Sequence, residues 1–587
     1  MMKTTTVSTP GKALLAGGYC VLESPNPGLV FATDSCFHAT ISTRPIYQRK
    51  HPQNETNDGT HEHPSENPLL RCPIDVYSPQ FHQVYSYCLH LNESPSEGEG
   101  TDSDSDSDDT VLIRIEPRHS HQPQNSYIQK TLLLAFAYVQ RTSNHLTEYI
   151  CNLASHSPNE ALAIRLLADN DFYSSIGYLK SNNLPISPQT VSTLPQFIPC
   201  PKDENGQVVV NKTGLGSSAT LVSSLVGAIL VHFEVVALEQ DDDDDDKCEG
   251  RTLLHNLAQI AHSLVQGKVG SGFDVSAALY GSHIYTRFDP TVIRDILAHL
   301  EQDLNRPSKV EDGLAIQFAT AGELAQVVQD EKRTWNSVVE SLVMPKGLGM
   351  MMADVCGGSE SPSMARKVLQ WKRERYSAGR KDKKCEGNDD DCWNLLLEAN
   401  SKVKALFEEG RSVEIPSILN AQEIASLSGL SENELKRLAM DIQKDTRDTS
   451  DVHEMEVRLK TVTIPFLTAL RRSFLQARSC LKQIGEASNV PIEPDEQTDL
   501  ANLTMDVPGV IAAGVPGAGG YDALYVIYIQ RENMNKDVTR DEIGRVWKEW
   551  CFNINAKGRK GAVCPLKCRS VGFEAMHGVH QRDLEWS

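Results

Sequence analysis

The sequence predicts a globular protein of two or more domains that contains both strands and helices. Its 587 residues are more than a single hydrophobic core organises. Short β-branched runs, such as residues 5–7, alternate with longer segments such as 466–486, whose apolar residues step by threes and fours. The hydrophobic content of 40% is ordinary for a globular protein with some polar insertions.

The overall charge excludes several classes of partner. A net charge of −21 argues against a surface for nucleic acid or an anionic membrane, but the acid is clustered, so a basic pocket for an anionic substrate is compatible with it. No run approaches 18 apolar residues, so we expect no membrane span. We also expect a cytoplasmic protein with reduced thiols. The 14 cysteines show no paired C-x-x-C spacing, residues 1–10 resemble no signal peptide, and residues 584–587 are no peroxisomal address.

The first elements are predicted from short apolar runs. Residues 5–7 read as a strand, and Pro10-Gly11 as a turn before a second strand that Gly17-Gly18 breaks. Lys12 is then either a solvated turn residue or a charge held near a cleft. β character resumes at 28–40. Further strands are expected at 111–115, 163–167 and 350–355, and helices at 127–140, 251–266, 364–371 and 466–486.

Four polar tracts interrupt these elements, near 48–67, 94–109, 241–246 and 379–391. Such tracts cannot bury apolar surface and are typical of loops or disordered insertions. The character of the chain shifts around 319–346, and we place a domain boundary near residue 340. The predicted domains are therefore 1–340 and 341–587.

The most informative stretch is a Gly/Ser-rich loop at 212–220. It follows the apolar run 208–210, which reads as a strand, and precedes an apolar helix at 221–233. A strand, a loop and a helix start in this order direct backbone N–H groups and the positive end of a helix dipole at one point, which suits phosphate. Its two serines add hydroxyl donors and a possible metal ligand. The alternative is an ordinary helix cap.

Two more glycine loops follow this one. Residues 266–278 place Asp274 at the start of a small-residue helix, either as a cap or as a base presented to a phosphate site. Residues 514–523 lie between apolar runs, either as a hairpin turn or as a loop that lies flat beside a ligand.

Together these loops resemble the three motifs of the GHMP kinases. The motifs appear as Pro10-Gly11-Lys12 through Leu22, as 214–219, and as 516–523. Residues 16–19, 266–274, 358–363 and 515–522 resemble in detail the eukaryotic phosphomevalonate kinases. The resemblance implies an α+β fold of two domains: an N-terminal ATP-binding domain like domain 2 of ribosomal protein S5, and a ferredoxin-like C-terminal domain, with the active site in the cleft between them.

The resemblance also implies roles for individual residues. Lys12 and Asp274 would be catalytic. The residues expected to bind ATP are Lys212, Gly214, Leu215, Gly216, Ser217, Ser218 and Ala219. Those expected to bind the acceptor are Gly18, Tyr19, Lys268, Ser271, Gly272, Ser359, Ser363, Gly517, Ala518, Gly519 and Gly520. Ser218 is the expected Mg²⁺ ligand. In mevalonate kinases a glutamate about eleven residues before the aspartate also holds Mg²⁺, but the count here ends at His262 or Ser263, neither of them a good ligand for that ion.

The implied reaction is ATP-dependent phosphorylation of 5-phosphomevalonate to 5-diphosphomevalonate, with ADP released, in the mevalonate pathway to isoprenoids and sterols. ATP and Mg²⁺ would be required, and the protein would be a monomer or homodimer. Three alternatives stay open: a sister kinase that acts on an alcohol such as mevalonate, a diphosphomevalonate decarboxylase, and a catalytically silent ATP-binding sensor.

Overall fold

The computed structural model describes residues 3–47, 70–92, 111–119, 122–238, 245–306, 312–330, 332, 334–355, 361–376, 392–416, 432–446, 452–533, 536–556, 562–569 and 578–582. The tracts predicted as insertions at 48–67, 94–109 and 379–391 lie outside these residues. So do residues 241–244 of the tract at 241–246, whose last two aspartates begin helix α6 (Asp245–Gln266).

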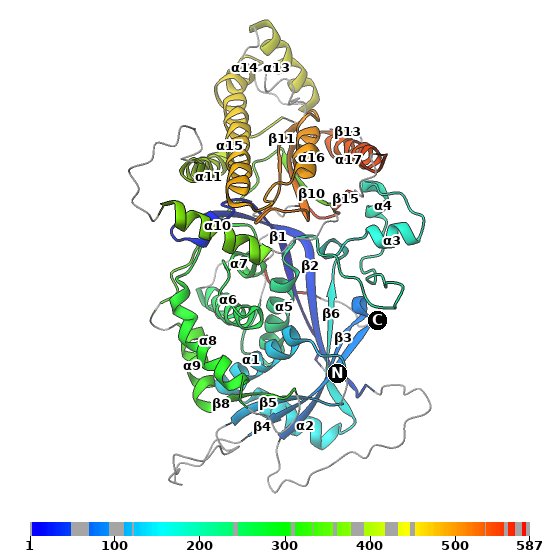
Figure 1. The fold of residues 1–587 in the computed structure, drawn as a ribbon, viewed down its shortest axis with the longest axis vertical. Helices are drawn as coiled ribbons and strands as arrows, with labels where there is room; N and C mark the ends of the chain where they lie inside the picture. The colour runs from blue at the N-terminus through cyan, green and yellow to red at the C-terminus, as the bar shows by residue number, and fades with distance from the viewer. Residues whose placement is uncertain are drawn as a thin grey trace.

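The larger of the described sheets has ten strands and forms the lower body in Figure 1. Its main path runs β16-β1-β2-β6-β3-β4-β5-β8, and β7 joins β2 to β9. The strands are β1 (Thr5–Ala16), β2 (Gly28–Pro45), β3 (Leu70–Ser78), β4 (Gln83–Leu91), β5 (Val111–Pro117), β6 (Glu160–Ala168), β7 (His283–Thr286), β8 (Leu314–Gln317), β9 (Val338–Ser341) and β16 (His580–Gln581).

Helices of the same part of the chain surround this sheet. They are α1 (Ser126–Thr142), α2 (His145–His156), α5 (Ser217–His232), α6, α7 (Phe273–Tyr280), α8 (Arg294–Leu304) and α9 (Phe318–Gln329), whereas α3 (Ile176–Ser181) and α4 (Pro188–Ser192) pack near Cys564 and α17 (Val538–Ala556) (Figure 1). Helix α5 packs directly on β1 and β2, and α1 and α6 pack against α5. Because α5 is enclosed by sheet and helices, it is apolar on almost all sides.

A second sheet of four strands forms the upper body, in the order β11-β12-β10-β15. Its strands are β10 (Leu348–Asp354), β11 (Val510–Gly514), β12 (Ala523–Ile529) and β15 (Cys564–Pro565). The helices around it are α10 (Ser361–Tyr376), α11 (Cys392–Glu409), α13 (Glu432–Thr446), α14 (Val452–Arg458), α15 (Ile464–Ser488), α16 (Asp495–Met505) and α17 (Val538–Ala556). A separate hairpin pairs β13 (Glu532–Asn533) with β14 (Lys536–Asp537).

The α+β class predicted from the sequence is confirmed. Sheet membership changes between β9 and β10, in the region of the predicted boundary near residue 340, and the division into domains 1–340 and 341–587 stays a prediction. One feature was not predicted: β15 belongs to the smaller sheet, but β16 pairs with β1 of the larger one. Within the described residues, no helix is long and apolar enough to cross a bilayer.

Two local predictions are wrong. Pro10-Gly11 is not a turn, because β1 continues from Thr5 to Ala16 with only a shift of pairing register between Pro10 and Lys12. At this irregularity the Lys12 amide donates to the carbonyl of Leu215 rather than to the neighbouring strand (3.0 Å). The expected strand at 208–210 is also absent from the structure: Val208 forms an isolated bridge with Lys202, and no strand covers these residues.

Candidate active site

Lys12 lies along the Gly/Ser loop that precedes α5. Its Nζ donates to the carbonyl of Gly214 (2.8 Å), and its backbone amide donates to the carbonyl of Leu215. A Cβ on Gly216 would lie 3.1 Å from Lys12 Cε and 3.8 Å from the Cβ of Asp274. The structure therefore brings the first motif, the second motif and the predicted catalytic aspartate together.

Two carboxylates from other parts of the chain act on the charge of Lys12. Burial lowers the pKa of the Lys12 ammonium, and the negative charges of Asp274 and Asp522 oppose that shift. The ammonium also lies 5.4 Å from the centre of the Phe273 ring. The interpretation of Lys12 as a solvated turn residue is wrong, because this ammonium is bonded to the loop before α5, is desolvated by burial and feels the charges of two carboxylates.

The loop before α5 has the backbone conformation on which the prediction of phosphate binding depends. Gly214 (φ 81°) and Gly216 (φ 83°) adopt the left-handed conformation that favours glycine, and α5 begins immediately afterwards at Ser217. The side chains of Leu215 and Ala219 are core residues, so they offer a ligand only their backbone.

Two polar side chains of the same stretch reach the site. Ser218 Oγ lies 3.2 Å from Nε2 of His262, a buried residue of α6. Lys212 is exposed, and its charge acts on the same imidazole. The hydroxyl of Ser217 instead forms a hydrogen bond with the Tyr173 side chain.

The third glycine loop packs against the end of β1. The amide of Gly517 donates to the carbonyl of Leu14 (3.0 Å), and the Tyr19 hydroxyl donates to the carbonyl of Ala518 (2.5 Å). A Cβ on Gly18 would lie 2.6 Å from the Gly517 carbonyl oxygen. The loop connects the antiparallel strands β11 and β12, so it is a hairpin connection and also a close neighbour of the first motif.

Asp274 stands in the first turn of α7, but it does not cap this helix. The N-cap residue is Gly272, and Asp274 Oδ1 accepts the adjacent amide of Val275 (3.0 Å). The loop before it is held in place because Gln259 Nε2 donates to the Gly272 carbonyl (2.7 Å) and the Tyr285 hydroxyl to the Ser271 carbonyl (3.1 Å).

The remaining predicted acceptor residues are only partly placed. Ser359 lies outside the described residues, and Ser363 is half-buried in the first turn of α10. Partial burial and the charge of Arg366, also on α10, lower the pKa of Lys268, whereas Asp274 opposes the shift. Sequence reasoning missed Arg366, for which the available signal was a basic residue three positions after Ser363.

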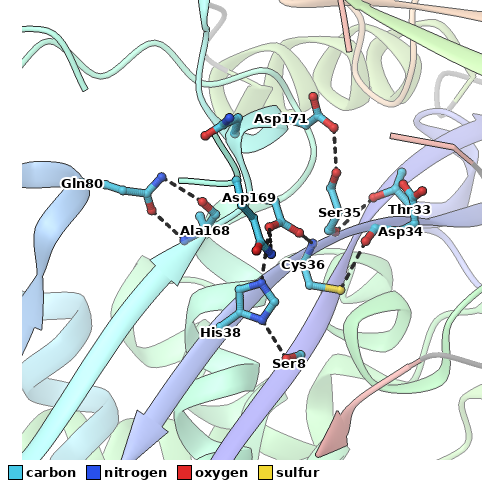
Figure 2. Close-up of polar contacts among 12 residues, drawn as sticks. Ser8, Thr33, Asp34, Ser35, Cys36, His38, Gln80, Ala168, Asp169 and Asp171 are labelled. Atoms are coloured by element: carbon cyan, nitrogen blue, oxygen red, sulfur yellow. Dashed lines mark hydrogen bonds and ion pairs between the residues drawn. The ribbon is translucent and has the colours of Figure 1, made fainter. Parts of the chain in front are cut away.

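Sequence reasoning also missed the hydrogen bonds of Asp171 that anchor the start of the loop before α5. Asp171 follows β6, and its buried carboxylate accepts hydrogen bonds from the Ser35 hydroxyl (2.7 Å) and from the amides of Lys567 (2.8 Å) and Cys568 (2.7 Å) (Figure 2 shows the Ser35 bond). The backbone carbonyl of Asp171 accepts the hydroxyl of Thr213, the residue just before Gly214. The base of the loop is thus joined to the segment that follows β15.

The neighbouring carboxylate, Asp169, fixes the same turn to β2. It accepts the amide of Cys36 (2.7 Å) and lies 3.5 Å from Nε2 of His38 (Figure 2). Burial alone would raise the pKa of Asp169, but these contacts hold it below its ordinary value.

A small hollow lies between the end of β1 and α15. Gly17, Gly18, Gly517 and Arg478 are among its lining residues. Arg478 forms a buried two-point ion pair with Glu493, with Nε and Nη2 2.8–3.0 Å from the carboxylate oxygens. This pair fastens the 491–494 turn, whose Ile492 carbonyl accepts the amide of Gly520 (2.8 Å).

Comparison with known proteins gives relatives over most of the chain. A phosphomevalonate kinase of Gibberella zeae is 31% identical over 587 residues, with 99% of this chain and 97% of the relative covered. A peroxisomal phosphomevalonate kinase of Arabidopsis thaliana is 30% identical over 529 residues, with 89% of each chain covered. Among solved structures, the phosphomevalonate kinase of Streptococcus pneumoniae with phosphomevalonate and AMPPNP is 15% identical, with a TM-score of 0.44 and 92% and 96% of the two chains covered. No family model matches the sequence.

Proposed function

Because the chain belongs to the phosphomevalonate kinase family, we propose that the residues gathered around Lys12 carry out the reaction of that family. The enzyme transfers the γ-phosphoryl group of ATP to the phosphate of 5-phosphomevalonate, and forms 5-diphosphomevalonate and ADP in the mevalonate pathway. The observation that supports the assignment of the site is the approach of Lys12 to Gly214, Gly216 and Asp274.

The chemistry determines which groups matter most. A phosphate oxygen is already ionised near neutral pH, so the acceptor needs no strong base. The difficulty is to bring two anions together in line, which requires positioning and neutralisation of charge. Lys12, the backbone amides of Gly214–Gly216 and the start of α5 supply that neutralisation.

Asp274 has a supporting part in this scheme. Its carboxylate favours the charged form of Lys12, which burial disfavours. It also orients the acceptor, and accepts a proton only when the acceptor phosphate is monoprotonated. The positive charge of Arg366 lowers the pKa of Lys268, so the two side chains lie near each other. We assign both to the acceptor phosphate.

The residues at the site fit Mg²⁺, which prefers oxygen ligands. Ser218 presents a hydroxyl oxygen in the first turn of α5, and Asp274 and Asp522 bring carboxylates to the same region. Bound Mg²⁺ would neutralise charge on the phosphates that are exchanged. Ser218 is the protein ligand that we propose for it.

A panel of acceptors tests the function. The purified protein, with ATP and Mg²⁺, is expected to release ADP with 5-phosphomevalonate and to be at least about 100-fold slower with mevalonate. Faster turnover of mevalonate would support the sister kinase, release of CO₂ from diphosphomevalonate would support the decarboxylase, and ATP binding without turnover of any acceptor would support the silent sensor.

Location and assembly are also proposals. We expect a cytoplasmic monomer or homodimer, although the Arabidopsis relative is named peroxisomal. Imaging of the full chain with a fluorescent tag at either end, and light scattering of the purified protein, test these two expectations.

A further inference from the structure

His262 occupies a special place beside the phosphate loop. In mevalonate kinases a Mg²⁺-binding glutamate lies about eleven residues before the aspartate, and the same count from Asp274 ends at His262 or Ser263. The side chain of His262 is buried on the face of α6 that meets α5. Its Nε2 lies 3.2 Å from Ser218 Oγ and 2.9 Å from Nε2 of Gln266, one turn further along α6.

The two neighbours of this nitrogen decide which way the hydrogen bonds run. The amide nitrogen of Gln266 only donates, so His262 Nε2 must be the unprotonated ring nitrogen that accepts. The Ser218 hydroxyl approaches the same nitrogen, so its proton shares the single lone pair of Nε2 with the Gln266 amide. With its proton directed at the imidazole, the Ser218 oxygen keeps its lone pairs for another partner.

We propose that His262 is a positioning residue, which holds the Ser218 hydroxyl proton and so presents the Ser218 oxygen to the Mg²⁺ that accompanies ATP. The proposal rests on the proposed function, because it takes the loop before α5 as the ATP site. It also decides between two roles that the sequence left open for this serine, in favour of metal ligand over phosphate donor.

The contact with the Gln266 amide nitrogen makes this imidazole a neutral acceptor, as the proposal requires. A neutral acceptor at this position also adds no negative charge where two phosphate groups must meet. A carboxylate in its place would repel both of them.

The test compares three substitutions in the full-length protein. His262→Leu removes the acceptor, whereas His262→Gln keeps one, because its amide oxygen can reach the place of Nε2. The matched control is His232→Leu: His232 is also buried and bonds a hydroxyl, that of Thr5 (3.1 Å), but about 20 Å further along α5.

The readout is binding rather than turnover. Electron paramagnetic resonance measures the affinity of Mn²⁺ for the enzyme–ADP complex, and calorimetry measures the affinity for ADP without metal. We expect His262→Leu to weaken Mn²⁺ binding by about 10-fold or more, a typical cost of losing the partner of a metal ligand, with metal-free ADP affinity changed less than about 2-fold. His262→Gln should stay within about 3-fold of wild type and His232→Leu should match it.

Ser218→Ala completes a double-mutant cycle. If His262 acts through Ser218, the variant with both His262→Leu and Ser218→Ala binds Mn²⁺ no more weakly than Ser218→Ala alone. Additive losses of Mn²⁺ affinity, wild-type Mn²⁺ affinity in a folded His262→Leu protein, or equal loss of metal-free ADP binding would each overturn the proposal.

If His262→Leu does not fold, the comparison of His262→Gln with Ser218→Ala decides. A similar loss of Mn²⁺ affinity in both variants overturns the proposal. Failure of the proposed function itself would instead appear in the acceptor panel.

Discussion

Lys12 is the residue on which the active-site proposal depends most. Its ammonium touches the phosphate loop and is flanked by Asp274 and Asp522. We expect Lys12→Ala and Asp274→Ala each to lower kcat at least about 100-fold, the scale of a lost transition-state contact. Steady-state kinetics with saturating ATP and 5-phosphomevalonate measure this, with circular dichroism as a check of folding. Near-normal kcat in either variant would refute the assignment of that residue.

A subtler prediction concerns the charge of Lys12. Asp274 opposes the lowering of the Lys12 pKa that burial causes, so Asp274→Asn should lower this pKa further. If protonated Lys12 is the active form, the alkaline limb of the kcat/KM profile moves to lower pH in Asp274→Asn. Asp522→Asn should move it the same way and less far, since Asp274 has the larger influence. An unchanged alkaline limb in both variants would contradict this account.

At the scale of residues, sequence reasoning named candidate residues that the structure brings together, but not all of their partners. Lys12, Ser218 and Asp274 were recognisable because glycines and serines surround them. His262 and Arg366 were not, because a histidine on an apolar helix face and a basic residue on a helix resemble many that have no such role. Their neighbours come from distant parts of the chain, and only folding reveals them.

At the scale of elements, the third glycine loop permits a matched comparison. Gly517 and Gly519 both have positive φ, 66° and 76°. A Cβ on Gly519 would come within 2.2 Å of the Ile492 carbonyl oxygen, whereas one on Gly517 would meet open space. Gly519→Ala should therefore raise the KM for the acceptor more than Gly517→Ala, which bears only the strain of the left-handed conformation, about 1 kcal/mol. Equal effects would show that the fit against Ile492 is unimportant.

The prediction of helices and strands succeeded where a single sequence pattern, such as regular apolar spacing, determined the local structure. The helix expected at 466–486 is α15, and the strands expected at 28–40 and 163–167 lie within β2 and β6. It failed at Pro10-Gly11 and at 208–210, where tertiary contacts outweigh local preference. The strand β1 continues past Pro10 because Lys12, Ala13 and Leu14 resume pairing with β2 after the irregularity. Val209 and Val210 stay 36% and 40% exposed instead of joining a sheet.

At the scale of the molecule, the last described segments join the two sheets, which no sequence pattern indicated. Asp171 links the segment after β15 to the base of the phosphate loop. In Asp171→Asn the amide NH₂ would face backbone donors, and we expect a loss of about 2 kcal/mol in the free energy of unfolding. Urea titration measures it, and hydrogen exchange should show faster amide exchange at Lys567 and Cys568. The exposed control Asp541→Asn should change the free energy by less than about 0.5 kcal/mol. Equal stability of the two variants would contradict the role of Asp171.

Acid stability of the whole protein depends on buried histidines. Burial lowers the pKa of His232, His255 and His283 to about 4 in each case, against an unfolded value of about 6.5. Between these values the unfolded chain binds more protons, so stability is fully present above about pH 6.5 and is lost as the pH falls towards 4. Each histidine accounts for up to about 3 kcal/mol of that loss.

Replacing a buried histidine with an uncharged residue separates the contribution of the histidine to acid stability from that of the carboxylates. His283→Gln should be less stable than wild type at pH 7.5, because the hydrogen bond to Ser276 (2.9 Å) is disturbed. The gap in the free energy of unfolding between the two proteins should narrow as the pH falls to 5. Urea midpoints at pH 7.5, 6.0 and 5.0 provide the measurement, with the exposed His156→Gln as control. A gap that stays constant with pH would mean that His283 does not enter the folded protein as the neutral imidazole, and the acid loss would then belong to other groups.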